Sequence, residues 1–313
     1  MTNIVMDFGS SQMRMYVPSK GVLTEPALIA TNTENEVMAV SKDALKMLGK
    51  TAKNITIYRP FCSGKIVNLT MAEYMIASYI KKYSFSNLFL PNVIVCVPDN
   101  ITKIESNTII NVLEQNGIRK ISFVSSVKSA FIATEKTKSI MHLHIGFKSG
   151  FCAVMANEQL ISYVELKVGG DTLNKDLTDY LRKTHGLSIG PLTAEFAKEE
   201  IGGIFPRDRL LSCHVKGRNI YTGLPNDIVI TSDETIEAYS SVMTEIAKSI
   251  EKCIENVPDE LLSDIVKYGI NISGGTAKLY GIDKYLQRRF KVPFKVVENP
   301  QELLVNALKD SKI

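Results

Sequence analysis

The chain has 313 residues, enough for two domains of about 150 residues that each bury a core of their own. The hydrophobic content of 45% is ordinary for a soluble protein, and the net charge of +4 comes without a dense basic run, so nucleic acid is not supported as a partner. Neither the five scattered cysteines nor the four histidines show metal-ligand spacing. We expect the cysteines to be reduced core residues of a cytoplasmic protein. We expect neither a transmembrane helix nor a signal peptide.

The first predicted element is a hairpin over residues 4–17 with a tight turn at 8–12. The turn offers small residues and backbone N–H groups, which suit a phosphate. Asp7 ends the first strand and is placed to bind Mg²⁺ directly or through water, but the spacing alone slightly favours an Asx turn that caps the strand. Ser10 and Ser11 are either phosphate donors or ordinary turn residues.

A small unit of two strands and a helix follows the hairpin. Strands are predicted over residues 27–30 and 37–40, and Ser41 is expected to cap a short helix that ends at Leu48. Thr70 is the expected N-cap of an amphipathic helix that runs to about Tyr83.

The loop at residues 84–91 is crowded with apolar side chains, among them Leu88 and Phe89. The usual fate of such residues is to fold back onto the core, and the composition alone favours this interpretation. The functional alternative is an exposed apolar tip that dips into a membrane or binds a partner.

An alternation of strands and helices comes next. A strand over residues 92–97 precedes a helix capped by Asp99 or Asn100, and a strand over 121–124 precedes a helix opened by Ser125 and Ser126. This alternation predicts a mixed or parallel sheet with helices packed on it.

A second hairpin over residues 141–155 repeats the plan of the first. Its strands, 141–145 and 151–155, flank a turn of sequence Gly-Phe-Lys-Ser-Gly. Two such hairpins predict a chain of two similar halves, whose turns could hold a phosphate chain between them if the halves face each other.

The second half continues with a strand over 159–168 and a tight turn at 169–171. A helix over 194–201 carries Glu195 and Lys198 at i, i+3, which the spacing alone favours as a surface ion pair rather than as part of a ligand pocket.

The last part of the chain is predicted to contain two strands within 211–230 and one long helix from Ser232. A strand over 268–272 then runs into Gly274 and Gly275 before a helix from about residue 278. This strand, glycine turn and helix form a third candidate for phosphate or nucleotide binding.

These three turns, in this order, resemble those of the actin-like ATPases, and the whole chain is similar to the MreB family of bacterial actins. The resemblance is carried by short stretches spread over nearly the full length: residues 7–10, 24–26, 47–51, 95–98, 169–171, 193–195, 200–202 and 222–225.

The resemblance implies an α/β, actin-like fold of two ribonuclease-H-like domains around a nucleotide cleft, each with a smaller subdomain. Domain I would comprise residues 1–137 plus 299–313, with its small subdomain at about 29–64. Domain II would comprise 138–298, with its small subdomain at about 174–234. ATP with Mg²⁺ would lie in the cleft, and subunits would join head to tail into filaments.

The resemblance also assigns residues to the site. Asp7 would lie near the metal, and Leu88 and Phe89 would form a membrane loop. The nucleotide would be bound by four groups of neighbouring residues: Gly9, Ser10, Ser11 and Gln12; Gly146, Phe147, Lys148 and Ser149; Glu195, Phe196, Ala197 and Lys198; and Gly274, Gly275, Thr276 and Ala277. This assignment reverses the interpretation of Glu195 and Lys198 as a surface pair.

The chain departs from the family at residues that serve hydrolysis. His144 stands where the family has an aspartate, and Phe147 and Lys148 replace glycines. Ser125 and Ser126 replace two glutamates, of which one helps to position the attacking water. Because a serine cannot act as a carboxylate base at neutral pH, we expect ATP to be bound but hydrolysed weakly or not at all, with no catalytic residue assigned.

The resulting hypothesis is an MreB-like cytoskeletal protein of cell shape, cytoplasmic and peripheral at the inner face of the membrane. Its partners would be copies of itself, other MreB-type subunits and the membrane surface, with no nucleic acid. One alternative is a nucleotide-independent regulator or co-assembly partner of a conventional MreB. The other is an active filament ATPase.

Overall fold

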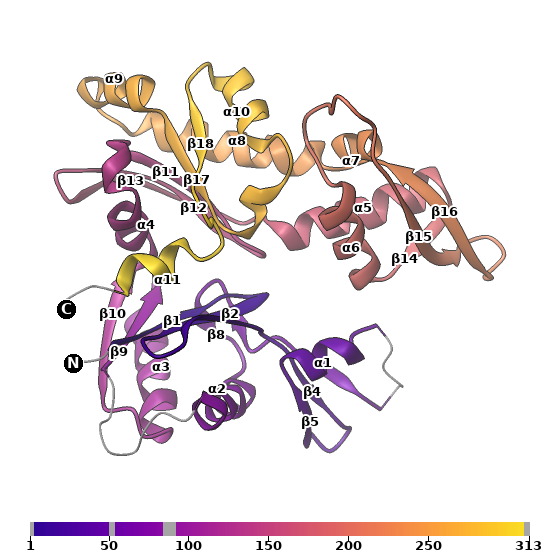
Figure 1. Ribbon diagram of the computed structural model, residues 1–313, viewed down its shortest axis with the longest axis horizontal. Coiled ribbons are helices and arrows are strands. Elements are labelled where there is room, and N and C mark those ends of the chain that lie inside the picture. The colour runs from indigo at the N-terminus through magenta and orange to yellow at the C-terminus, as the bar shows by residue number, and fades with distance from the viewer. Residues whose placement is uncertain (1–2, 50–53, 84–91, 310–313) are drawn as a thin grey trace. The chain divides into compact units, whose positions relative to one another are not determined.

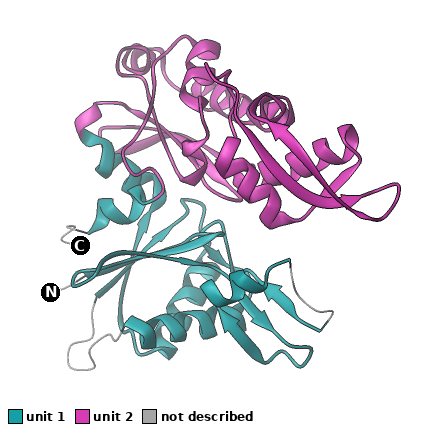
Figure 2. Ribbon diagram, turned by 45° about the vertical axis from the view of Figure 1, so that its right-hand side comes forward, with its two compact units in different colours: residues 1–135, 302–313 teal, residues 136–301 magenta. Residues whose placement is uncertain are grey.

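The computed structural model describes residues 3–49, 54–83 and 92–309 (Figure 1). The chain divides into two compact units (Figure 2). Unit 1 comprises residues 1–135 and 302–313, and unit 2 comprises residues 136–301.

A five-stranded mixed sheet forms the centre of unit 1, in the order β10-β9-β1-β2-β3. The predicted hairpin is confirmed, because β1 and β2 pair antiparallel, and β9 and β10 extend the sheet in parallel, as the alternation predicted. The strands are β1 (Asn3–Phe8), β2 (Gln12–Val17), β3 (Gly21–Pro26), β9 (Asn92–Val97) and β10 (Lys120–Ser125).

Helices cover both faces of this sheet. Alternate residues of β1, such as Ile4 and Met6, pack into the main core with α2 (Leu69–Tyr83) and α3 (Lys103–Gln115). The opposite face is covered by α4 (Ser126–Thr134) and α11 (Leu303–Leu308), which contact each other as well as the sheet. Asp7 and Arg14, which lie opposite each other on β1 and β2, are on this second face.

A smaller sheet and a short hairpin complete unit 1. The sheet has the order β5-β4-β6 and carries α1 (Lys42–Met47). The remaining elements are β4 (Ile29–Thr31), β5 (Val37–Val40), β6 (Thr56–Tyr58), β7 (Phe61–Cys62), β8 (Lys65–Ile66) and the 3₁₀ turn η1 (Glu135–Thr137), which reaches into unit 2.

Unit 2 repeats the topology of the unit 1 sheet. Its order is β13-β12-β11-β17-β18, with an antiparallel β11–β12–β13 meander and two parallel additions. This agreement confirms the prediction of two similar halves. The strands are β11 (Met141–Ile145), β12 (Gly150–Ala156), β13 (Gln159–Leu166), β17 (Ile270–Ser273) and β18 (Phe294–Val296).

Seven helices and a small sheet of order β14-β15-β16 surround this sheet in the described part of unit 2. One hydrophobic core contains residues of both the five-stranded sheet and the small sheet. The elements are α5 (Gly170–Thr184), β14 (Leu187–Ile189), α6 (Pro191–Ile201), β15 (Ser212–Asn219), β16 (Pro225–Thr231), α7 (Ser232–Ala238), α8 (Ser240–Glu255), α9 (Asp259–Tyr268), η2 (Gly275–Lys278) and α10 (Ile282–Phe290).

Several predicted boundaries were wrong. Helix α2 begins at Leu69, one residue before the predicted cap, and the Asn68 side chain accepts the Met71 N–H at 3.1 Å. Helix α3 is capped by Thr102, which forms a reciprocal capping box with Glu105. In both cases the residue that satisfies the first helical N–H groups defines the start of the helix.

The long helix predicted from Ser232 is two helices, α7 and α8, separated at Tyr239. Tyr239 has φ −89° and ψ 0°, outside the helical region, and its side chain is fully buried. Helix α8 then buries Val242, Met243 and Ile246 in the core, whereas α7 contributes only Ala238 among the described core residues.

Strand β3 was not predicted, because it contains the polar residues Thr24 and Glu25. Glu25 is nonetheless buried, and its carboxylate accepts hydrogen bonds from Ser41 (2.5 Å), Lys82 (2.6 Å) and Tyr83 (2.5 Å). Ser41 occupies the N-cap position of α1, but its side chain serves Glu25 rather than the helix. The network ties β3 to α1 and α2.

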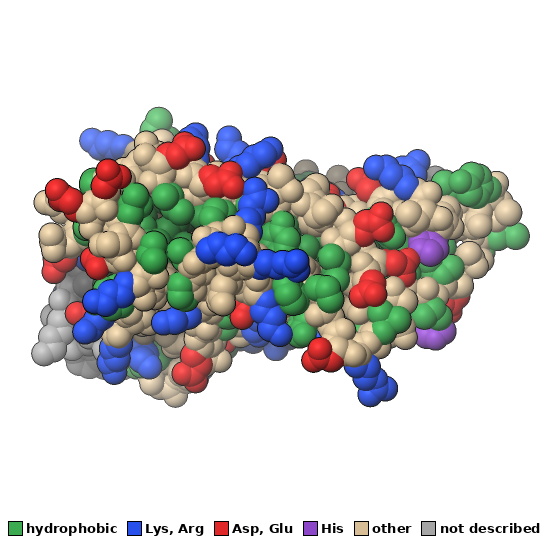
Figure 3. All heavy atoms as spheres, turned by 90° about the horizontal axis from the view of Figure 1, so that it is seen from above, with side chains coloured by type: hydrophobic (Ala, Val, Ile, Leu, Met, Phe, Trp, Pro, Cys, Tyr) green, Lys and Arg blue, Asp and Glu red, His purple; other side chains and the backbone are tan. Residues whose placement is uncertain are grey.

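Among the described helices, none has the length and apolar character needed to cross a membrane. Basic and acidic side chains both occur across the face of the molecule shown in Figure 3, interspersed with hydrophobic ones. Among the described residues that this view shows, no extended surface carries a single charge sign.

Candidate functional site

The first predicted phosphate turn, residues 9–12, is closely packed in unit 1. A Cβ on Gly9 would lie 2.4 Å from the Gln12 carbonyl oxygen, so only glycine fits. Ser10 is buried, and its Oγ accepts the Ser63 N–H at 2.9 Å. Ser11 and Gln12 are half-buried, and the Ser11 carbonyl accepts the backbone N–H at position 27 at 2.9 Å.

Asp7 and Arg14 lie opposite each other on β1 and β2, and Cys96 lies opposite Asp7 on β9. Paired residues point to the same face of a sheet, so the three side chains share the face covered by α4 and α11. Burial raises the pKa of Asp7, and the Arg14 cation opposes that rise. Burial lowers the pKa of Arg14, against the attraction of Asp7 and Glu302. Burial and the Asp7 charge raise the pKa of the Cys96 thiol to about 12.

These residues do not fit a Mg²⁺ ion held by Asp7. Mg²⁺ requires nearly octahedral oxygen coordination, usually with one or two carboxylates. Asp7 interacts electrostatically with a guanidinium that cannot lose its charge under ordinary conditions and that repels a dication. Among the described residues, no three His, Cys, Asp or Glu side chains are grouped to hold a metal ion.

The side chains of Ser125 and Ser126 both form hydrogen bonds at the start of α4. Ser125 caps the helix by accepting the Lys128 N–H at 3.0 Å, and Ser126 donates to the Val97 carbonyl at 3.0 Å. These contacts are those of ordinary structural hydroxyls.

Asp99 is a carboxylate at this helix start that the sequence interpretation assigned to a different helix. It accepts the Val127 N–H at 3.1 Å and is hydrogen-bonded to Ser125. Burial raises its pKa, partly offset by these two hydrogen bonds. Asp99 therefore stabilises α4 rather than α3, and no local sequence pattern distinguishes these two roles.

The second predicted phosphate turn, residues 146–149, is anchored on the neighbouring elements of unit 2. The Gly146 N–H closes the turn onto the Ser149 carbonyl at 2.9 Å. The Gly146 carbonyl accepts from Thr276 Oγ1 at 2.8 Å and from the Gly170 N–H at 3.1 Å. The side chains of Phe147, Lys148 and Ser149 are all half-buried on this anchored turn.

Three segments predicted separately from the sequence meet at Gly170, the first residue of α5. A Cβ on Gly170 would lie 3.2 Å from Phe147 Cδ2, 3.2 Å from Lys198 Nζ and 3.4 Å from Thr276 Oγ1. These three side chains come from the second turn, from α6 and from η2. The structure thus brings them together around one backbone position. We call these three residues, together with the Glu195 carboxylate that is paired with Lys198, the Gly170 cluster.

Glu195 and Lys198 belong to the cluster and are not a surface pair. Lys198 Nζ lies 2.9 Å from Glu195 Oε2 and 3.2 Å from the Gly170 carbonyl, and Asn174 also donates to Glu195. The side chains of Lys198 and Glu195 are 13% and 32% exposed, whereas the equally spaced pair Glu245–Lys248 is 55% and 62% exposed. Asn174 was missed because its contact with Glu195 links two different helices.

His144 packs among side chains of unit 2. His144 Nδ1 lies 2.9 Å from Ser273 Oγ, and His142 Nε2 lies 2.7 Å from the same hydroxyl. The His144 ring stacks on Phe151 with 5.3 Å between centroids. Burial lowers the pKa of His142 to about 3, so this ring is neutral at pH 7.

The remaining residues predicted to bind nucleotide differ in the space around them and in their exposure to solvent. Gly274 has φ +91°, and Gly275 would accept a Cβ without meeting any atom within 4 Å. Phe196 is 49% exposed, whereas the methyl groups of Ala197 and Ala277 belong to the core. The predicted membrane residues, Leu88 and Phe89, lie outside the described residues.

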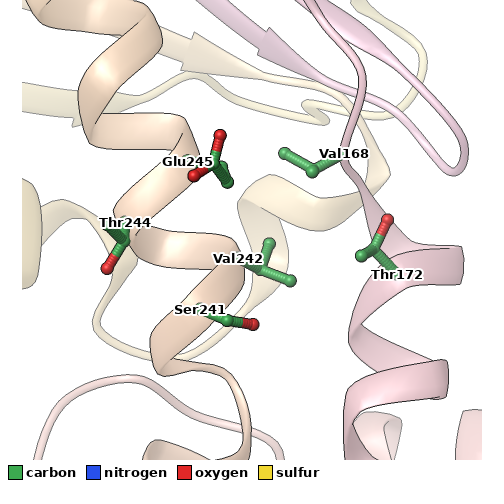
Figure 4. A pocket seen from close by; sticks show the side chains of 6 residues that line it. All are labelled: Val168, Thr172, Ser241, Val242, Thr244 and Glu245. Carbon is green, nitrogen blue, oxygen red and sulfur yellow. The ribbon is translucent and has the colours of Figure 1, made fainter.

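A pocket of about 290 Å³ lies between α5 and α8 (Figure 4). Ser241, Val242, Thr244 and Glu245 of α8 line one side, and Thr172 and Val168 line the other. None of the residues predicted to bind nucleotide lines this pocket.

Comparison with known proteins identifies the family. The model of the MreB/Mbl protein family matches residues 1–312. Cell shape-determining protein Mbl of Bacillus subtilis is 31% identical over 307 residues, which cover 96% of this chain and 92% of Mbl. Cell shape-determining protein MreB of Escherichia coli is 32% identical over 312 residues, covering 95% and 89%.

The crystal structure of MreB5 of Spiroplasma citri bound to ADP superimposes with a TM-score of 0.93. The match has 26% identity and covers 98% of this chain and 94% of MreB5. MreB5 bound to AMPPNP matches equally well. This chain has the actin-like fold and belongs to the MreB/Mbl family.

Proposed function

We propose that this chain binds ATP, hydrolyses it weakly or not at all, and assembles into membrane-associated filaments that contribute to bacterial cell shape. The cell-shape role of its relatives Mbl and MreB supports the cellular part of the proposal. The nucleotides bound to MreB5 support the biochemical part. In this proposal units 1 and 2 are the two actin-like domains. Because the proposed filaments are associated with the membrane, we also propose a cytoplasmic location at the inner face of the membrane.

The Gly170 cluster is the observation that carries nucleotide binding. It combines an ammonium group, a carboxylate and a hydroxyl around the backbone of the first residue of α5, at Lys198, Glu195 and Thr276. A carboxylate accepts from ribose hydroxyls, and an ammonium donates to sugar or ring acceptors. Because Asn174 and Gly170 hold this pair in position, little side-chain freedom would be lost on binding.

Lys198→Met tests this part of the proposal. Loss of a charge-assisted hydrogen bond of roughly 1.5–3 kcal/mol should weaken ATP binding about 10- to 100-fold. The matched control is Lys248→Met, which breaks an exposed i, i+3 pair of the same residue types on α8. Equal affinities of wild type and both variants, measured by equilibrium dialysis, would contradict the assignment.

Weak hydrolysis is proposed because no glutamate is present at Ser125 or Ser126, and because His144 replaces an aspartate. The second candidate function, an active filament ATPase, is favoured by Asp99, a carboxylate bonded to Ser125. Phosphate release in filament-forming conditions separates the two. Ser126→Glu should increase the rate if the missing carboxylate limits turnover, whereas Asp99→Asn should decrease it if Asp99 positions the water.

Contact with a membrane is proposed from the apolar sequence around Leu88 and Phe89. The double variant Leu88→Ser/Phe89→Ser should remain in the supernatant when wild-type protein pellets with liposomes. Self-assembly is measured in the same centrifugation without lipid, which keeps filament formation separate from membrane binding. Unchanged lipid pelleting of the double variant would refute the role of this loop.

A further inference from the structure

Arg14 is a charged residue in unit 1 for which the proposed function has no role so far. It lies on β2 opposite Asp7, on the sheet face covered by α4 and α11. A Cβ on Gly9 would lie 3.7 Å from Arg14 Nη1. The guanidinium is therefore adjacent to the backbone of the first phosphate turn.

The guanidinium of Arg14 has a donor that forms no hydrogen bond with the described residues. Arg14 Nε is buried and has no hydrogen-bond partner, and Arg14 forms no ion pair within the described residues. Asp7 and Glu302 act on it electrostatically, and both are acidic. A buried donor without a partner is unfavourable, and more so when it is charged, unless a ligand satisfies it.

A phosphate is the ligand that suits such a group. Guanidinium presents a planar fork that binds two phosphate oxygens at once, and it keeps its charge when buried. The small residues and N–H groups of the adjacent turn suit the same ligand. A Mg²⁺ ion held by Asp7 does not fit at this place, for the electrostatic reason given above.

We propose that Arg14 supplies the positive charge that holds the nucleotide's phosphates at the first turn, so that this chain binds ATP without a divalent cation. The inference rests on the proposed nucleotide binding. Asp7 then acts as a counter-ion that orients Arg14, and not as the ligand of a metal.

The test is equilibrium dialysis of labelled ATP against the full chain, in excess EDTA and in excess Mg²⁺. Wild-type affinities in the two buffers should agree within about threefold, which corresponds to less than 1 kcal/mol. Arg14→Gln, which keeps a donor but removes the charge, should lose more than about tenfold in EDTA. Arg289→Gln, at an exposed arginine paired with Glu251, is the matched control and should bind as wild type does.

Asp7→Asn distinguishes a counter-ion of Arg14 from a metal ligand, because the two roles predict opposite changes in the affinity for ATP. If Asp7 is the counter-ion of Arg14, its neutralisation leaves a less compensated cation, and ATP should bind at least as tightly in EDTA. If Asp7 holds a metal, the variant should lose affinity in Mg²⁺. Thermal melts of each variant identify loss of folding.

The outcomes separate this inference from the proposed function. Wild-type binding in Mg²⁺ that falls more than about tenfold in EDTA, together with no further loss in Arg14→Gln, would overturn the role of Arg14 and leave nucleotide binding in place. No wild-type binding in either buffer would overturn the proposed nucleotide function, and the role of Arg14 with it.

Discussion

Replacement of Gly169 by alanine probes how the second phosphate turn is held in unit 2. Gly169 has an extended backbone with φ −178°, which any residue adopts, so alanine introduces no backbone strain. Its Cβ, however, would lie 2.5 Å from the Gly146 carbonyl oxygen and 2.6 Å from that of Phe147. Both atoms belong to the backbone, so no side-chain rotation relieves the contact.

The cost can be estimated from two contributions. Forcing a methyl group into a closely packed position costs typically 1–3 kcal/mol. The same shift stretches the hydrogen bonds from the Gly170 N–H to Gly146 and from the Asp171 N–H to Phe147, now 3.1 Å and 2.8 Å. Each is worth about 1 kcal/mol, so stretching that removes about half of their strength adds about 1 kcal/mol in all. We expect Gly169→Ala to destabilise unit 2 by about 2–4 kcal/mol, a fall in its melting temperature of roughly 4–16 °C.

Differential scanning calorimetry measures the change, with Gly203→Ala as the matched control. A Cβ on Gly203 meets only ordinary contacts with Tyr280, the nearest at 3.4 Å, and its φ is not positive. The control should melt near the wild-type temperature. A Gly169→Ala protein that melts with the control would refute the conclusion that this contact anchors the turn.

Two further predictions concern unit 1. Burial alone would raise the pKa of Glu25, but hydrogen bonds from Lys82, Ser41 and Tyr83 lower it below its ordinary value. Wild type should therefore be more stable than Glu25→Gln by about 1–2 kcal/mol at pH 7, and this difference should disappear as the pH falls below about 4; urea titrations that show the same difference at both pH values would contradict it. Asp99→Ala should cost about 1 kcal/mol because the Val127 N–H at the start of α4 loses its acceptor, whereas Asp99→Asn should stay close to wild type in the same titration.

Local patterns in the sequence predicted the elements that local patterns determine. The two hairpins were predicted because apolar, β-branched or aromatic residues flank short turns, and the pairings β1–β2 and β11–β12 confirm them. The repeated topology of the two units follows from the same patterns. Helix boundaries were less accurate because they depend on single hydrogen bonds, such as those of Asn68 and Thr102.

Contacts between distant segments were beyond such patterns. Strand β3 was missed because burial of Glu25 depends on Lys82 and Tyr83, which lie far along the chain. Arg14 was interpreted as one more strand residue, since its position opposite Asp7 requires the register of β2. The residues of the Gly170 cluster were assigned to the site through the family resemblance, while spacing alone indicated a surface ion pair.

The most direct test of the central claim is a single-turnover assay with labelled ATP and Mg²⁺ that separates bound from cleaved nucleotide. If the Gly170 cluster binds ATP and the serines at the start of α4 cannot support hydrolysis, the label will be recovered as bound, uncleaved ATP. Bound but rapidly cleaved nucleotide would contradict the loss of hydrolysis. No bound nucleotide at all would contradict the binding site itself, and would leave an actin-like protein that works without nucleotide.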